Sequence, residues 1–212
     1  MKNATKHADE LKSLLKRLAR EGKPPPRQPQ DPLQALVRGA MTFDVPDNRA
    51  EEAMKVVQRE FVDLNELRVA TDLEVQELLG NKYPAIERRV AMITLSLNNI
   101  FEREHTLSLD RLRTLSKRDA RQFLRGFPEV HPFVEAYVML MSFDGHCIPV
   151  DELMLDHLRR LEIVDEQTSL EDATKFLEHH IKAEDCYDFY YQCRRVSQDD
   201  SSDSDKKKKA KG

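Results

Sequence analysis

Apolar residues recur at helical spacing through most of the chain, and no long segment shows the two-residue alternation of β-branched side chains expected of a strand. From Asp31 to about Val196 the pattern is helical throughout. Pairs typical of helix N-termini interrupt it: Thr71 with Glu74, Ser116 with Asp119, and Ser169 with Asp172. Gly80 and Gly126 stand where glycine commonly ends a helix. The sequence therefore predicts an all-α fold of about nine to eleven short helices.

The two ends of the chain differ in composition from the middle. Leucines at 11, 14, 15 and 18 recur among lysines and arginines, so residues 1–22 are predicted to form a basic amphipathic helix. Its leucines are expected to dock on the main domain, or its charges to contact nucleic acid or an acidic protein partner. A proline-rich linker follows over 23–30, a domain over 31–197, and a disordered Asp/Ser/Lys tail over 198–212.

The net charge of −4 hides an uneven distribution. Residues 1–30 hold eight Lys/Arg and three Asp/Glu, and residues 196–212 hold five lysines and four aspartates. The middle of the chain then carries 21 basic and 31 acidic residues, a net charge of −10. Because duplex DNA attracts cations, this middle is a poor DNA binder unless its basic residues gather on one face.

Composition also excludes several classes of protein. Only six glycines are present, too few for glycine-rich loops that hold nucleotide phosphates, so no nucleotide cofactor is expected. The three cysteines, Cys147, Cys186 and Cys193, form no CxxC pair, which favours a reducing cytoplasm and argues against a zinc site. No run of about 18 apolar residues exists, so no membrane span is predicted.

Residues 31–197 resemble the endonuclease III type of the helix-hairpin-helix (HhH-GPD) DNA glycosylase superfamily. The segment 31–53, DPLQALVRGAMTFDVPDNRAEEA, resembles the opening helix and the loop on the lesion side. The segment 113–164 resembles the hairpin, the catalytic helix and the aspartate that follows them. In the family, a hairpin of the form LPGVGxKTA precedes this aspartate by eighteen residues, counted from its lysine. Here Asp151 follows Phe133 by the same interval. The resemblance implies an all-α, two-lobed fold and, as partner, damaged double-stranded DNA.

Two positions carry the chemistry that the resemblance implies. The family's lysine forms a Schiff base with the sugar, and Phe133 in its place has no amine, so lysine-dependent AP-lyase activity is not expected. Asp151 is the candidate catalytic residue, because a carboxylate can stabilise an oxocarbenium-like sugar. Asp151 also begins a predicted helix, so a purely structural N-cap is the alternative.

The DNA-contacting positions differ from the family more strongly. Glu129, Val130 and His131 occupy the hairpin, where the family has glycines that bring backbone N–H groups close to a phosphate. An ordinary interhelical turn, with Pro132 at the start of the next helix, is the favoured interpretation. Asp44 aligns with a glutamine that fills the gap left by the flipped base, and Asp47 is predicted to cap the next helix.

No iron–sulfur cluster is expected, because the first cluster cysteine would fall near Ser197 and no cysteine follows it. Two functions remain open. One is a base-excision-repair glycosylase without lyase activity that uses Asp151, with Phe133 lining its base pocket. The other is a catalytically inactive descendant that binds DNA weakly or binds a protein.

Overall fold

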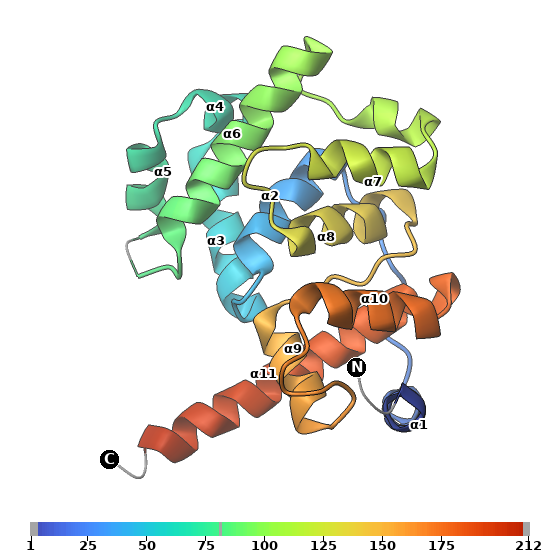
Figure 1. Cartoon of the computed structure of the whole chain (residues 1–212). Helices are drawn as coiled ribbons and strands as arrows, with labels where there is room; N and C mark the ends of the chain where they lie inside the picture. The colour runs from blue at the N-terminus through green and yellow to red at the C-terminus, as the bar shows by residue number, and fades with distance from the viewer. Residues whose placement is uncertain (1–3, 81, 210–212) are drawn as a thin grey trace. The chain divides into compact units, whose positions relative to one another are not determined.

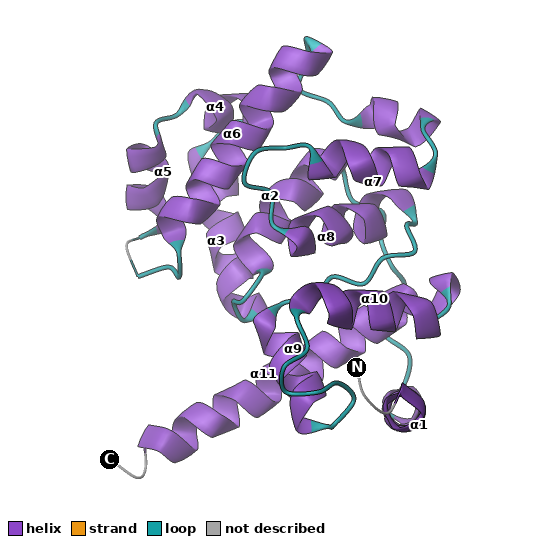
Figure 2. Cartoon of the chain, viewed as in Figure 1, coloured by secondary structure: helices purple, strands orange, loops and turns teal. Residues whose placement is uncertain are grey.

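The computed structural model describes residues 4–80 and 82–209, and every regular element in these two ranges is helical (Figures 1 and 2). The all-α prediction is confirmed. The α-helices are α1 (Ala4–Arg20), α2 (Pro32–Thr42), α3 (Asp47–Glu60), α4 (Leu64–Val69), α5 (Asp72–Leu79), α6 (Ile86–Glu104), α7 (Lys117–Arg125), α8 (Pro132–Phe143), α9 (Glu152–Arg160), α10 (Leu170–His180) and α11 (Cys186–Lys209). Two 3₁₀ turns accompany them, η1 (Asp110–Thr114) and η2 (Ala183–Asp185). None of these helices combines the length and the hydropathy needed to cross a lipid bilayer.

The chain divides into two compact units, in line with the predicted two-lobed fold. One unit comprises Met1–Gln28 and His146–Gly212, and the other comprises Pro29–Gly145. The first therefore holds α1 with α9, α10 and α11, and the second holds α2 to α8. The sequence predicts a separate N-terminal helix and a domain over 31–197. In the structure, α1 belongs to the same unit as the C-terminal helices.

The second unit is built around the pairing of α2 with α8. Nearly every residue of both helices is buried, which their apolar sequences explain. Gly39 makes this pairing possible, since a Cβ there would lie 3.3 Å from Cδ1 of Tyr137 and 3.4 Å from Cγ1 of Val134. Such spacing is tighter than most Cβ contacts, so the side chains of Tyr137 and Val134 would have to shift by a few tenths of an ångström to admit a side chain at position 39.

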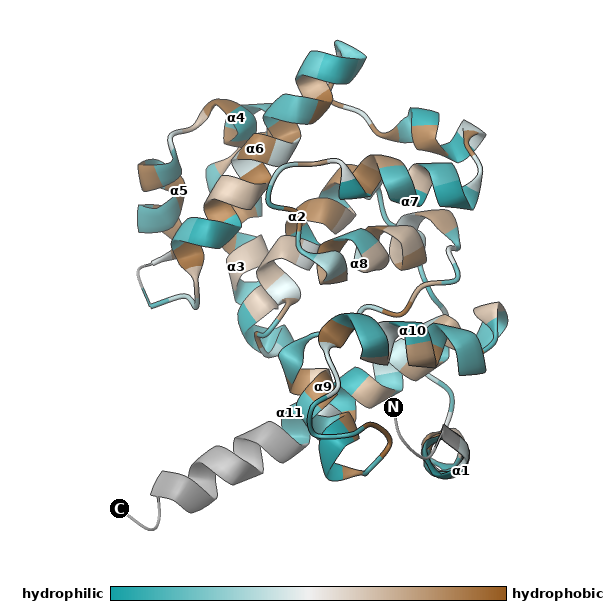
Figure 3. Cartoon of the chain, in the orientation of Figure 1, coloured by the Kyte–Doolittle hydropathy of each residue, from teal (hydrophilic) through white to brown (hydrophobic). Residues whose placement is uncertain are grey.

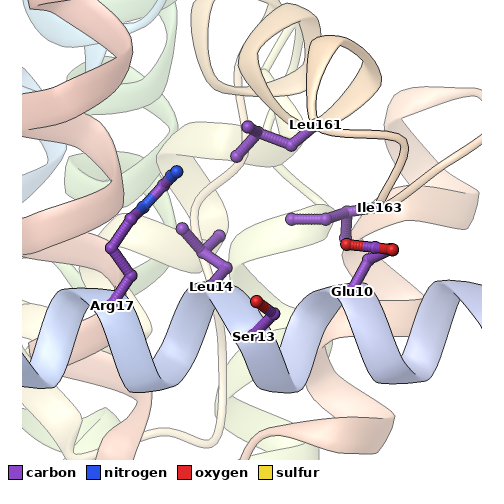
Figure 4. A pocket seen from close by; sticks show the side chains of 6 residues that line it. All are labelled: Glu10, Ser13, Leu14, Arg17, Leu161 and Ile163. Carbon is purple, nitrogen blue, oxygen red and sulfur yellow. The ribbon is translucent and has the colours of Figure 1, made fainter.

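In the first unit, the leucine face of α1 is buried. Leu11, Leu14 and Leu18 are almost fully enclosed. Figure 4 shows Leu14 beside Leu161 and Ile163, where α1 and the turn after α9 enclose a pocket of about 70 Å³. Docking of the leucines is one of the alternatives that the sequence leaves open for this helix, and the structure places them in the core of this unit.

Polar contacts hold both ends of α1. At its C-terminal end, Nε2 of Gln192 donates to the carbonyl of Leu18 at 3.1 Å. Near its N-terminus, Nε2 of His7 lies 3.2 Å from a carboxylate oxygen of Asp165. The helix is thus fastened by both apolar and polar groups.

The predicted capping residues are found at the helix ends. Thr71 and Glu74 form a reciprocal capping box at the start of α5. Ser116 and Ser169 cap α7 and α10 by accepting from the backbone N–H three residues ahead. Gly80 and Gly126 follow α5 and α7 directly, and Gly80 has a positive φ of 85°.

One prediction about a helix end differs from the structure. Pro46 holds the N-cap position of α3 and Asp47 is the first helical residue, so the helix begins one residue earlier than an N-cap at Asp47 would give. At the C-terminus, α11 is assigned from Cys186 to Lys209, and the disordered tail over 198–212 stays a prediction. Residues 210–212 of the predicted tail lie outside the described residues.

Candidate functional site

The hairpin between α7 and α8 keeps a backbone conformation that favours glycine. Glu129 has a φ of +56°, in the left-handed region. The N–H of Val130 donates to the carbonyl of Phe127 at 3.5 Å, and the N–H of His131 donates to the sulfur of Met92 at 3.4 Å. These two amides therefore form hydrogen bonds within the protein. In the family that the sequence resembles, amides of the hairpin would instead face a DNA phosphate.

His131 ends the hairpin and starts α8. Its Nδ1 accepts the N–H of Phe133 at 3.2 Å, and Pro132 is the first helical residue, as predicted. The imidazole also stacks on the ring of Phe43, with a centroid separation of 4.3 Å and an interplanar angle of 1°. The hairpin is thus tied to the loop after α2, which is the loop that carries Asp44.

Phe133 belongs to a closed aromatic cluster. It is 1% exposed and stacks on Tyr137 at 5.9 Å, while its centroid lies 6.5 Å from that of Phe43. Phe43 and Tyr137 are also buried. At the position of the family's lysine, the side chain is therefore packed into the interior of its own unit.

Arg89 organises the loop that contains Asp44. Its guanidinium donates to the carbonyls of Ala40 at 2.6 Å, Phe43 at 2.7 Å and Pro84 at 2.7 Å. It also lies 3.9 Å from the centroid of the Phe43 ring, a cation–π contact. Two of these carbonyls are at the end of α2, whose last turn leaves oxygens without helical partners. Asp44 follows directly, with a φ of +54°.

Glu135 is a buried carboxylate on α8. Nε of Arg125 donates to one of its oxygens at 2.7 Å, and Nε of Arg121 bonds to the other. Two arginines of α7 therefore form ion pairs with a carboxylate of the protein itself. The sequence does not predict a role for this cluster or for Arg89. No sequence motif indicates either of them, because their partners are distant in the chain or lie on a second helix.

Asp151 lies in the other unit, at the N-cap of α9. Its Oδ1 accepts the N–H of Met154 at 3.0 Å, and its Oδ2 accepts from Nη1 of Arg194 at 2.6 Å. The Asp151 side chain is 0% exposed and that of Arg194 is 3% exposed. Both carboxylate oxygens are therefore engaged within this unit.

The three cysteines are buried. Burial, together with the nearby charge of Asp151, raises the pKa of the Cys193 thiol to about 12. Across the described parts of the chain, no group of three or more His, Cys, Asp or Glu side chains is arranged to hold a metal ion.

The structure therefore places the candidate residues in two separate sets. Phe133 and His131 share the aromatic cluster with Phe43, and Glu129 and Val130 precede them in the same hairpin. Asp151 shares its surroundings with Arg194 in the unit that contains α9 and α11.

No protein-family model matches the sequence, and no curated protein matches it. Solved structures do match its fold. An 8-oxoguanine glycosylase/lyase from Clostridium acetobutylicum, in complex with double-stranded DNA, superposes with a TM-score of 0.73 and 18% identity over 94% of this chain and 71% of its own. Endonuclease III, in a non-covalent complex with DNA, gives a TM-score of 0.70 and 13% identity over 88% and 84%. A 3-methyladenine DNA glycosylase from H. pylori gives 0.67 and 12% over 92% and 98%. The chain thus has the fold of the helix-hairpin-helix (HhH-GPD) DNA glycosylase superfamily.

Proposed function

We propose that this chain is a DNA-binding protein of the glycosylase fold whose base-excision site is compromised and which has no AP-lyase activity. The observation that carries the proposal is the state of Asp151. Its carboxylate is fully buried, and its two oxygens accept from Arg194 and from the N–H of Met154. A carboxylate that stabilises an oxocarbenium-like sugar must face that sugar, and this one faces an internal cation.

Two further features support the loss of chemistry. Phe133 supplies no amine for a Schiff base and packs among Phe43 and Tyr137. The hairpin carries the negative charge of Glu129 where a phosphate would approach, and two of its amides bond internally.

Binding of DNA is supported by fold and by local conformation. The similar structures include glycosylases in complex with DNA, and Glu129 retains a left-handed backbone. The basic N-terminal and C-terminal segments would supply cations that the acidic middle lacks. These features support weak, salt-sensitive binding.

A second candidate function, a glycosylase without lyase activity, is favoured by one observation. Asp151 caps the first turn of α9 through Met154, and the family's aspartate also stands at a helix start. In that case, Asp151 would have to release its ion pair with Arg194 and face the substrate sugar when DNA binds.

A lesion screen distinguishes the two candidates. Duplexes that bear alkylated, oxidised, deaminated or mismatched bases are incubated with the protein, and excision is measured by alkaline cleavage. Borohydride trapping on abasic-site DNA tests lyase chemistry in parallel, and an active 8-oxoguanine glycosylase/lyase is the positive control. We expect DNA retention at low salt, no excision and no covalent adduct. Excision that disappears when Asp151 and Arg194 are replaced together by Asn and Gln would establish the second candidate.

A further inference from the structure

Exposed large apolar side chains are concentrated in one short segment of the described chain. Val62 is 93% exposed, Val69 and Leu73 are each 63% exposed, and Leu78 is 41% exposed. Single exposed apolar residues are normal on protein surfaces, whereas a local concentration of them marks a binding surface. Hydrophobic and hydrophilic residues alternate along α4 and α5 in Figure 3.

The helical geometry directs two of these side chains away from the core. Both α4 and α5 pack on α6, with Leu67 and Val75 buried. Val69 follows Leu67 by two residues, and Leu73 precedes Val75 by two, a rotation of about 200° in each helix. Both side chains therefore point away from the core. The two residues are four positions apart in the sequence, which limits the distance between their Cα atoms to about 14 Å.

The same segment is acidic. Residues 62–78 carry five carboxylates and one arginine. The guanidinium of Arg68 lies over the ring of Phe101 at 4.2 Å and donates to Asn98 at 2.9 Å, so it is held towards α6. Hydrogen bonds from the backbone and side chain of Thr71 lower the pKa of Glu74, so this carboxylate carries its charge at neutral pH like the others in the segment. A surface of this charge repels DNA phosphates and attracts a cationic partner.

We propose that the surface formed by Val62, Val69, Leu73 and the carboxylates around them, here called the α4–α5 surface, binds a basic amphipathic helix of a partner protein. The apolar face of the partner would cover Val69 and Leu73, and its lysines and arginines would meet the carboxylates. The α1 helix of this chain is also basic and amphipathic, but its leucines are buried in its own unit and are not available to cover this surface. The capping box of Thr71 and Glu74 fixes the start of α5, next to Leu73.

Fluorescence anisotropy with the full chain tests this proposal. The probe is a fluorescein-labelled leucine–lysine peptide of about 18 residues with its leucines on one helical face. We expect the double variant V69S/L73S to bind it about tenfold or more weakly than the native protein, since two apolar side chains no longer cover the peptide. The matched control is L95S, an exposed leucine of α6 outside the acidic segment, which should change the affinity less than about twofold.

Several outcomes would overturn the proposal. One is equal affinity of the native protein and V69S/L73S, and another is equally tight binding of a scrambled peptide whose leucines surround the helix. Sedimentation that changes from dimer to monomer in V69S/L73S would assign the surface to a second copy of this chain. Loss of duplex DNA binding in the same variant would assign it to DNA. Melting temperatures of all three proteins should agree, because the substituted side chains are exposed.

Discussion

Arg194 donates to Asp151 over 2.6 Å in a site from which water is almost fully excluded. The pair joins the N-cap of α9 to α11 and so contributes to the packing of the first unit. Burial of one charge without the other carries a large desolvation penalty, so each residue depends on its partner. The carboxylate of Asp151, which the resemblance proposes as catalytic, is therefore a structural group of this unit.

The first prediction concerns replacement of Asp151. From the sequence alone, Asp151→Asn should cost little stability, because asparagine caps a helix about as well as aspartate. The buried guanidinium of Arg194 changes this expectation. Asp151→Asn should lower the free energy of unfolding by about 3–5 kcal/mol, because it leaves a buried charge without its counter-ion. Urea denaturation measures the loss. The double variant D151N/R194Q should lose less than the two single variants combined, and strictly additive losses would contradict the coupling.

The second prediction concerns the hairpin. The left-handed backbone of Glu129 costs on the order of 1–2 kcal/mol for a residue with a side chain. Glu129→Gly should raise the free energy of unfolding by about 1 kcal/mol, after the greater chain entropy of glycine in the unfolded state is subtracted. It should also tighten DNA binding at low salt by removing a negative charge.

The control for this change is Glu102→Gly on the exposed side of α6, which should cost about 1 kcal/mol, the opposite sign. Thermal melting reports both changes. A destabilised E129G protein would show that the side chain of Glu129 makes a contact worth more than the backbone strain.

The sequence predicts features that depend on neighbouring residues and misses those that depend on distant ones. Thr71 with Glu74, and the helix starts at Pro132 and Asp151, follow from local backbone requirements, and each is found. The partner of Asp151 lies 43 residues away, and Arg89 reaches a carbonyl 49 residues away. Charged side chains are ordinarily exposed, so nothing local indicates that these two arginines are buried.

The third prediction locates DNA affinity in the basic ends of the chain. Deletion of residues 1–30 would strip buried leucines from the first unit, so substitution of exposed charges is the cleaner test. Replacing Lys16, Arg17 and Arg20 by glutamine, together with truncation after Ser197, should abolish binding at moderate salt. The slope of log K against log salt should fall by about 0.9 for each DNA phosphate that the protein no longer neutralises.

A matched variant replaces Lys55, Arg59 and Lys175, which are exposed cations of the acidic middle. It should bind nearly as well as the native protein. Binding that survives loss of the basic ends, with a steep salt dependence, would show that a local basic face in the middle outweighs the net charge.

The fourth prediction concerns the thiols. Burial is the main cause that raises the pKa of Cys193 and of Cys186 to about 12, and nearby carboxylates add to it. At pH 8 only about one thiol in ten thousand is then ionised, and the thiolate is the reactive form. Ellman's reagent should find almost no reactive thiol in the native protein and three in guanidinium. Rapid modification of one thiol without denaturant would contradict the enclosure of that site.

The last prediction uses the pair of Glu51 on α3 and Arg38 on α2, whose atoms lie 2.7 Å apart. The hydrogen bond from Arg38, and then its charge, lower the pKa of Glu51 below its ordinary value. A carboxyl group whose folded-state pKa is depressed contributes stability above its unfolded-state pKa of about 4.3 and loses that contribution as the pH falls through the folded-state pKa.

Because half of the Glu51 side chain is exposed, solvent screens the pair, and Glu51→Gln should cost about 0.5 kcal/mol at pH 7. The difference in unfolding free energy between the native protein and E51Q should shrink below about pH 4.3 and vanish once the native carboxyl is protonated. About 1 M salt at pH 7 should reduce it as well. Urea unfolding at a series of pH values measures this difference. A difference that stays constant from pH 7 into the acid range would show that packing, not charge, holds α2 against α3 at this point.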